Sequence, residues 1–157
     1  MLGTTIGGWE VLGGLLGTAA ILNLFGEISN TAAAKTLFAL ILGMCAFSIV
    51  AGAMLLLGVS AGRPLSLIVQ GVQILQFSFG WCRFELLIGP RLQLGLLEGW
   101  RPAAFFTTLP SFHLGIGGWS VPYCAINLFA LASLIFLVEF WKPKAAPPHE
   151  RPAFDTQ

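Results

Sequence analysis

Long uninterrupted runs of apolar residues dominate the pattern of this chain. Four runs reach the roughly 20 mostly apolar residues that a helix needs to cross a bilayer core. They cover residues 9–25, 36–58, 64–82 and 122–141. Because these runs are continuous rather than alternating, and because a helix satisfies its own backbone in lipid, they predict helices. The expected fold class is an all-α integral membrane protein with four transmembrane helices.

Proline placement and composition agree with membrane helices. Pro64 and Pro122 stand where the third and fourth helices would start, a position that tolerates a missing backbone N–H. Hydrophobic residues make up 56% of the chain and charged residues only 10%, with a mean hydropathy of +0.83. A soluble globular domain has roughly a quarter of charged residues, so that class is excluded, as is intrinsic disorder. A net charge of +1 gives no basic footprint for nucleic acid.

The segment between the third and fourth runs is unusually long. Residues 83–121 contain many leucines and phenylalanines, so they are too apolar for a disordered linker. They predict a long, partly apolar loop that lies on the membrane surface or against a partner. Residues 1–141 would then form one transmembrane domain. Residues 142–157 form a proline-rich polar tail that is expected to be extended.

Charge and tryptophan placement indicate an orientation. An even number of spans puts both termini on one side, which carries Arg63, Lys142 and Lys144 close to span ends. The excess of basic residues in cytoplasmic loops favours cytoplasmic N- and C-termini. Tryptophans prefer the membrane interfaces. One interface is marked by Trp9 and Trp141, and the other by Trp81, Trp100 and Trp119.

The third run carries an unusual polar face. Three glutamines in one span are costly in hydrocarbon, so this face should point into the protein. It has two interpretations: a polar pathway or headgroup site, or hydrogen bonds that hold neighbouring helices together. In the second interpretation the glutamine amides bond to asparagines of the first and fourth helices. The residues concerned are Ser66, Gln70, Gln73 and Gln76 on the third run, with Asn23 and Asn127 as partners.

Charged residues gather at one predicted interface, where Glu27, Arg83 and Glu85 lie. Arg83 and Glu85 are two residues apart, so they do not face one another on a regular helix. Each needs another partner, and Glu27 is the expected partner of Arg83. The cluster fits an ion entrance or an anchor for a lipid headgroup, and it also fits interfacial charges that pair with one another.

Two cysteines fall near the same membrane face. Cys82 ends the third run and Cys124 begins the fourth. If that face is extracytoplasmic, a Cys82–Cys124 disulfide can form. The alternative is that both remain free thiols packed among apolar groups.

Small residues at four-residue spacing mark faces where helices can pack closely. The first helix carries Gly13 and Gly17, and the second carries Ser48 and Gly52 as well as Ala39 and Gly43. These pairs predict close packing of the first two helices, or of either helix against another subunit.

Residues for catalysis or metal binding are scarce. The two histidines, His113 and His149, lie outside the spans, so a haem or metal site within the bundle lacks ligands. No nucleophile–base motif or phosphate-binding loop is present. We therefore expect no enzyme activity, no cofactor and no metal.

The expected function is that of a non-catalytic accessory or structural subunit in a larger membrane complex. That complex could be respiratory, photosynthetic or secretory, and the expected partners are other membrane subunits and lipids. The alternative is a small oligomeric transporter, channel or lipid-binding bundle that uses the polar face of the third helix.

Overall fold

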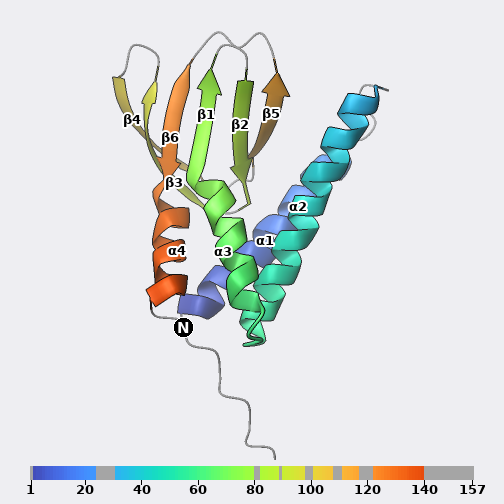
Figure 1. Cartoon of the computed structure of the whole chain (residues 1–157), viewed down its shortest axis with the longest axis vertical. Coiled ribbons are helices and arrows are strands. Elements are labelled where there is room, and N and C mark those ends of the chain that lie inside the picture. The colour runs from blue at the N-terminus through green and yellow to red at the C-terminus, as the bar shows by residue number, and fades with distance from the viewer. Residues whose placement is uncertain are drawn as a thin grey trace, which may run out of the picture.

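The computed structural model of the chain describes residues 2–23, 31–79, 82–88, 90–97, 101–107, 111–116 and 122–139. These residues form helices and an antiparallel sheet (Figure 1). The helices are α1 (Leu2–Asn23), α2 (Ala32–Leu56), α3 (Gly62–Ile74) and α4 (Leu128–Glu139). The strands are β1 (Leu75–Phe79), β2 (Cys82–Leu87), β3 (Arg91–Leu97), β4 (Arg101–Thr107), β5 (Ser111–Ile116) and β6 (Tyr123–Asn127).

The prediction of an all-α protein with four transmembrane helices is wrong. The expected third span, 64–82, is α3 followed directly by β1, and the expected fourth span, 122–141, starts as β6 and continues as α4 (Figure 1). The interval 83–121, expected to be an interfacial loop, contains strands β2 to β5. Among the described helices, two are long and apolar enough to cross a membrane, Gly3–Asn23 and Ala32–Leu56. The tail 142–157 lies outside the described residues.

The strands form because polar and apolar residues alternate along this part of the chain. In β2 and β3 the order is Arg83, Phe84, Glu85, and then Arg91, Leu92, Gln93, Leu94. A period of two places one kind of side chain on each face of a strand, which a helix of period 3.6 cannot do. This short-range alternation was present in the sequence, but the high overall hydropathy of the surrounding runs concealed it.

The six strands pair in the order β4-β3-β6-β1-β2-β5. Phe77 of β1 lies opposite both Phe84 of β2 and Cys124 of β6, and Leu94 of β3 lies opposite Ala104 of β4. Directly opposed residues point to the same face, so residue parity sorts the described side chains into two faces.

One face of the sheet is apolar throughout its described side chains. We call it the apolar face; it consists of the odd-numbered residues of β1 and the even-numbered residues of β2, β3, β4 and β6. The opposite, polar face carries every charged residue of these five strands. Pro102 lies in β4, an edge strand, which is where proline is tolerated in a sheet.

Helices α1 and α2 form a tightly packed hairpin. A Cβ atom at Gly52 would lie 2.5 Å from the backbone oxygen of Gly7, and one at Gly14 would lie 2.8 Å from that of Cys45. The Ser48 hydroxyl donates to the backbone oxygen of Glu10 at 3.0 Å. The expected close packing of the first two helices is therefore confirmed at Ser48 and Gly52. A Cβ at Gly43 would meet nothing within 4 Å, so that residue is not part of the contact.

The turn after α2 directs the chain into α3. Gly58 adopts a left-handed conformation with φ 72°, and its N–H donates to the Leu55 oxygen while the Val59 N–H donates to the Met54 oxygen. This pair of bonds is the Schellman helix ending, which favours glycine. At the same end of the molecule, Arg63 donates to the Leu137 and Val138 oxygens at 2.7 and 2.5 Å. A cation at the C-terminus of α4 also complements the helix dipole.

Candidate functional site

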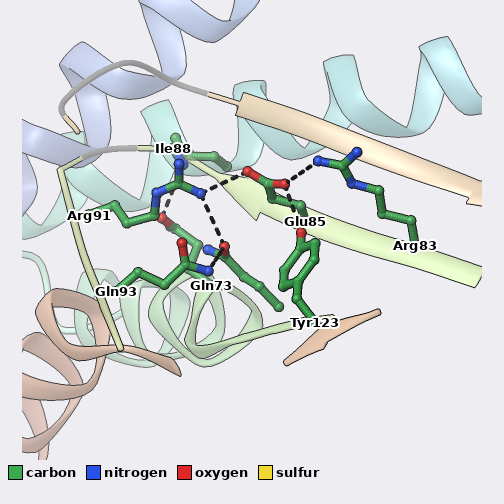
Figure 2. A network of polar contacts seen from close by, with 8 residues as sticks. Gln73, Arg83, Glu85, Ile88, Arg91, Gln93 and Tyr123 are labelled. Carbon is green, nitrogen blue, oxygen red and sulfur yellow. Dashed lines mark hydrogen bonds and ion pairs between the residues drawn. The ribbon is translucent and has the colours of Figure 1, made fainter. Parts of the chain in front are cut away.

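The polar face of the sheet is organised around the carboxylate of Glu85, which is only 7% exposed. Arg83 donates from Nη2 to Oε2 at 3.0 Å, and Arg91 donates from Nη1 to Oε1 at 2.8 Å. The hydroxyl of Tyr123 donates to Oε2 at 2.9 Å. Figure 2 shows these three side chains pointing toward Glu85 from strands β2, β3 and β6. We call Glu85 and these three donors the Glu85 cluster.

The direct contact of Arg83 with Glu85 corrects one sequence expectation. On a helix, residues two apart point in different directions, so the helical interpretation predicts a separate partner for each residue. On β2 they lie on the same face, because side chains alternate with a period of two. Glu27, the partner expected for Arg83, lies outside the described residues.

Two glutamines extend the Glu85 cluster along the polar face. The Gln76 oxygen accepts from Arg91 Nη1 at 3.3 Å and from Gln93 Nε2 at 2.7 Å. Arg91 Nε and Gln76 Nε2 are buried donors that have no acceptor among the described residues. Buried donors that lack an acceptor cost free energy. This region therefore offers more donors than acceptors.

A cavity of about 220 Å³ opens beside the Glu85 cluster. One part of its wall is charged or polar, and another is apolar. The wall is formed by Arg83, Glu85, Arg91, Gln93 and Tyr123, together with Gly95, Leu96, Phe105 and Ala125. All of these except Leu96 belong to the polar face by register. The combination of basic donors and an apolar wall suits a small acidic group attached to an apolar one.

The polar residues of α3 hold helices together, but through a partner that sequence reasoning missed. Glu10 of α1 is 1% exposed. Its carboxylate accepts from the Ser66 hydroxyl at 2.7 Å and from Gln70 Nε2 at 2.8 Å. The expected partner of the glutamines, Asn23, is an exposed residue at the end of α1. The sequence did contain a sign that Glu10 needs a buried partner, because it is the one charged residue between residues 2 and 23.

Gln73 and Asn127 fix the junction between helices and sheet. The Gln73 oxygen accepts from the Ile88 N–H at 3.0 Å, just after β2 ends. The Asn127 side-chain oxygen accepts from the backbone N–H groups of Phe129 and Ala130 at 3.1 and 3.4 Å, so Asn127 is the N-cap of α4. Gln76, expected at the border of a helix face, instead lies in β1.

A second, much smaller cavity of about 10 Å³ lies at this junction, lined in part by Glu10, Gln73 and Asn127. Asn127 Nδ2 is buried, and none of the described residues supplies an acceptor for it. The volume is close to the minimum that one water molecule needs. We assign this cavity to hydration of the junction rather than to a ligand.

The two cysteines of the expected disulfide lie on different strands that are not neighbours. Cys82 belongs to β2 and Cys124 to β6, and β1 lies between them. Two strand spacings amount to about 9.6 Å, beyond the roughly 7 Å that a disulfide allows between Cα atoms. Cys124 is accordingly a free thiol in the structure.

No group of three or more residues suited to a metal ion occurs within the described residues. Comparisons with protein-family models, with curated proteins and with solved structures find no match for this chain. The chemistry of the Glu85 cluster and its cavity is therefore the basis for assigning a function.

Tyr123→Phe removes a single hydroxyl from the Glu85 cluster. We expect the free energy of unfolding to fall by about 1.5–3 kcal/mol, the usual range for a hydrogen bond to a charged group. The measurement is chemical denaturation of the purified protein in detergent, followed by tryptophan fluorescence. In a Glu85→Leu background the same substitution should cost much less, because the acceptor is already absent. An equal cost in both backgrounds would show that the hydroxyl acts elsewhere.

Proposed function

We propose that the protein is a multi-pass integral membrane protein with cytoplasmic termini that binds the acidic headgroup of an amphiphile at the Glu85 cluster. It carries out no chemistry on that ligand. The observation that carries this proposal is the excess of cationic donors beside a cavity with a partly apolar wall. The two apolar helices α1 and α2 support insertion into a membrane, where such amphiphiles are found.

The charge balance of the cluster favours an anionic ligand. Arg83 and Arg91 contribute two positive charges, while Glu85 contributes one negative charge, which leaves a net charge of +1 on the wall of the cavity. Arg91 Nε is a buried donor without an acceptor in the part of the chain that the structure describes. A phosphate or carboxylate oxygen would supply that acceptor, and the planar guanidinium group suits both kinds of anion.

The size of the cavity limits the ligand to a headgroup. A volume of about 220 Å³ is smaller than the roughly 300–1,000 Å³ of pockets that enclose whole drug-sized ligands. The apolar chains of an amphiphile would therefore extend from the cavity. Phe105 and Ala125 on its wall offer the apolar surface that such chains contact first.

The test compares an anionic with a zwitterionic lipid. Purified protein in detergent is titrated with short-chain phosphatidylglycerol, short-chain phosphatidylcholine and inorganic phosphate, and bound species are counted by native mass spectrometry. We expect one phosphatidylglycerol to bind more tightly than either of the others. Arg91→Gln should weaken this binding about tenfold, the effect of losing one charge-assisted contact of ~1.4 kcal/mol.

Arg101→Gln is the matched control for the binding test. It removes the same charge from an exposed arginine of β4 that does not line the cavity. Its affinity for phosphatidylglycerol should stay close to that of the unchanged protein. Equal weakening by both substitutions, or equal binding of the two lipids, would contradict the proposed site. Phosphate binding as tightly as phosphatidylglycerol would show that the apolar wall plays no part.

The two free edges of the sheet favour a second candidate function, that of an accessory subunit in a larger membrane complex. Strands β4 and β5 are the edges of the sheet, and each has one side without a strand neighbour within the described residues. Unpaired edges readily accept a strand from another chain. Extraction from native membranes in a mild detergent should then recover this chain with partner subunits at a fixed stoichiometry.

A further inference from the structure

The apolar face of the sheet is strongly exposed. On this face Phe106 is 71% exposed, Leu75 55% and Leu94 48%. These residues come from three different strands, so the exposure extends across much of the sheet. A soluble monomer rarely leaves a continuous apolar patch of this kind uncovered. Something outside the described chain must therefore cover the face.

Helix α3, which packs against α2, and helix α4, which packs against α3, connect the sheet to the hairpin of α1 and α2. Helix α3 passes into β1, and β6 into α4, without an intervening residue. The 13 residues of α3 and the 5 of β1 together extend about 36 Å, at about 1.5 Å per helical and 3.3 Å per strand residue. The 25 residues of α2 extend about 37 Å by the same helical rise. Both distances exceed the roughly 30 Å of a bilayer core.

The sheet lies at the level of one half of the helix hairpin. In Figure 1 the sheet stands beside the N-terminal half of α2, while α3 and α4 stand beside its C-terminal half. A bilayer that contains the whole length of α1 and α2 therefore also extends to the level of the sheet, where its hydrocarbon can contact the apolar face. Exposed apolar residues also occur on α4, at Ile135, and on α2, at Leu40.

The residue pattern of the strands supports the same placement. In β1, β2 and β3, residues of the apolar face alternate with residues of the polar face, which carries Gln76, Arg83 and Gln93. This alternation is the pattern of strands that contact lipid on one face.

We propose that the apolar face of the sheet contacts the hydrocarbon of a lipid bilayer, at the level of the N-terminal half of α2. The partner of this surface is thus lipid acyl chains rather than a second copy of the chain or a soluble protein. The two edge strands need a hydrogen-bonding partner in that environment, because an open sheet edge is unfavourable in hydrocarbon. This inference does not depend on the ligand proposed for the Glu85 cluster.

Adjacent alanines of β4 give a matched pair for the test. Ala104 belongs to the apolar face and Ala103 to the polar face. Each is changed to cysteine in a background that carries Cys45→Ala, Cys82→Ala and Cys124→Ala, and a nitroxide spin label is attached. The protein is reconstituted in phosphatidylcholine vesicles, and the accessibility of each label to oxygen and to a water-soluble nickel chelate is measured by electron paramagnetic resonance.

Lipid, water and protein around residue 104 would each give a different result for the label at that position. Contact with lipid predicts high accessibility to oxygen and low accessibility to the nickel chelate, with a clearly lower oxygen-to-nickel ratio at residue 103. High accessibility of residue 104 to the nickel chelate would place the face in water and overturn the proposal. Low accessibility to both reagents would show that protein covers the face, and would overturn it as well.

A second measurement uses the unchanged chain, in case the cysteine-free background does not fold. The protein is reconstituted with phosphatidylcholine that carries a photoactivatable diazirine on an acyl chain, and adducts are located by mass spectrometry. We expect adducts on the apolar face of β3 and β4 as well as on α1 and α2. Adducts on α1 and α2 without any on β3 and β4 would overturn the proposal while leaving the two helices in the membrane.

Discussion

Glu85→Leu is expected to lower the free energy of unfolding by about 3–5 kcal/mol, the usual cost of removing one partner from a buried ion pair. Arg91 would lose the carboxylate that lies 2.8 Å from its Nη1, and Tyr123 would lose its acceptor. Three strands meet at this carboxylate, so the loss should affect the whole sheet. The measurement is chemical denaturation of the purified protein in detergent, followed by tryptophan fluorescence.

Two further variants test whether the loss of stability in Glu85→Leu comes from its broken ion pairs. Glu139→Leu removes an exposed carboxylate at the end of α4 and should change the free energy of unfolding by no more than about 0.5 kcal/mol. The double variant Glu85→Leu/Arg91→Leu should be at least about 1 kcal/mol less destabilised than the sum of the single variants, because it leaves no unpaired Arg91. A Glu85→Leu protein as stable as the Glu139→Leu protein would refute the ion-pair assignment.

Gly52→Leu is expected to separate α1 from α2 and to cost about 3 kcal/mol, the upper part of the usual range for overpacking. The added Cβ would lie 2.5 Å from the backbone oxygen of Gly7, and backbone cannot rotate aside as a side chain can. Ser48 and Glu10 are on the same contact, so their hydrogen bond should weaken too. Thermal unfolding in detergent measures the loss.

Gly43→Leu is the matched control, since it makes the same substitution in the same helix. A Cβ at Gly43 meets nothing within 4 Å. Replacing glycine inside a helix also raises helix propensity by up to about 1 kcal/mol. The Gly43→Leu protein should therefore be as stable as the unchanged protein or slightly more stable. Equal losses for Gly43→Leu and Gly52→Leu would mean that the hairpin does not pack as described.

Local features of the hairpin could be predicted from the sequence. The apolar runs that contain α1 and α2 are long and continuous, so hydropathy alone indicates helices of membrane-crossing length. The small residues Ser48 and Gly52 mark the contact between them. Both signals can be read within a single helix, and the backbone hydrogen bonds that stabilise a helix also lie within it. The local sequence pattern is therefore sufficient to predict such a helix.

The sheet was missed because its stability depends on residues far apart in the sequence. Strand β1 has five residues, and its partner β6 begins more than forty residues later. Phe77 lies opposite Cys124 and Leu75 opposite Ile126, which are pairs that no local pattern specifies. The alternating residues of β2 and β3 were the local signal for strands. The hydropathy of 64–82 and 122–141 outweighed it, because each helix–strand pair has the length and apolarity of one membrane helix.

Residue types and their spacing were enough to predict the apolar character of the chain, the packing of α1 against α2 and the interest of four polar residues: Ser66, Gln70, Arg83 and Glu85. Their partners could be identified only from the fold: Glu10 for the residues of α3, and Arg83, Arg91 and Tyr123 for Glu85. The physical reason is that a costly buried polar group requires a partner without specifying which one. The register of the sheet and the crossing of the helices select that partner by placing particular donors and acceptors within hydrogen-bonding distance.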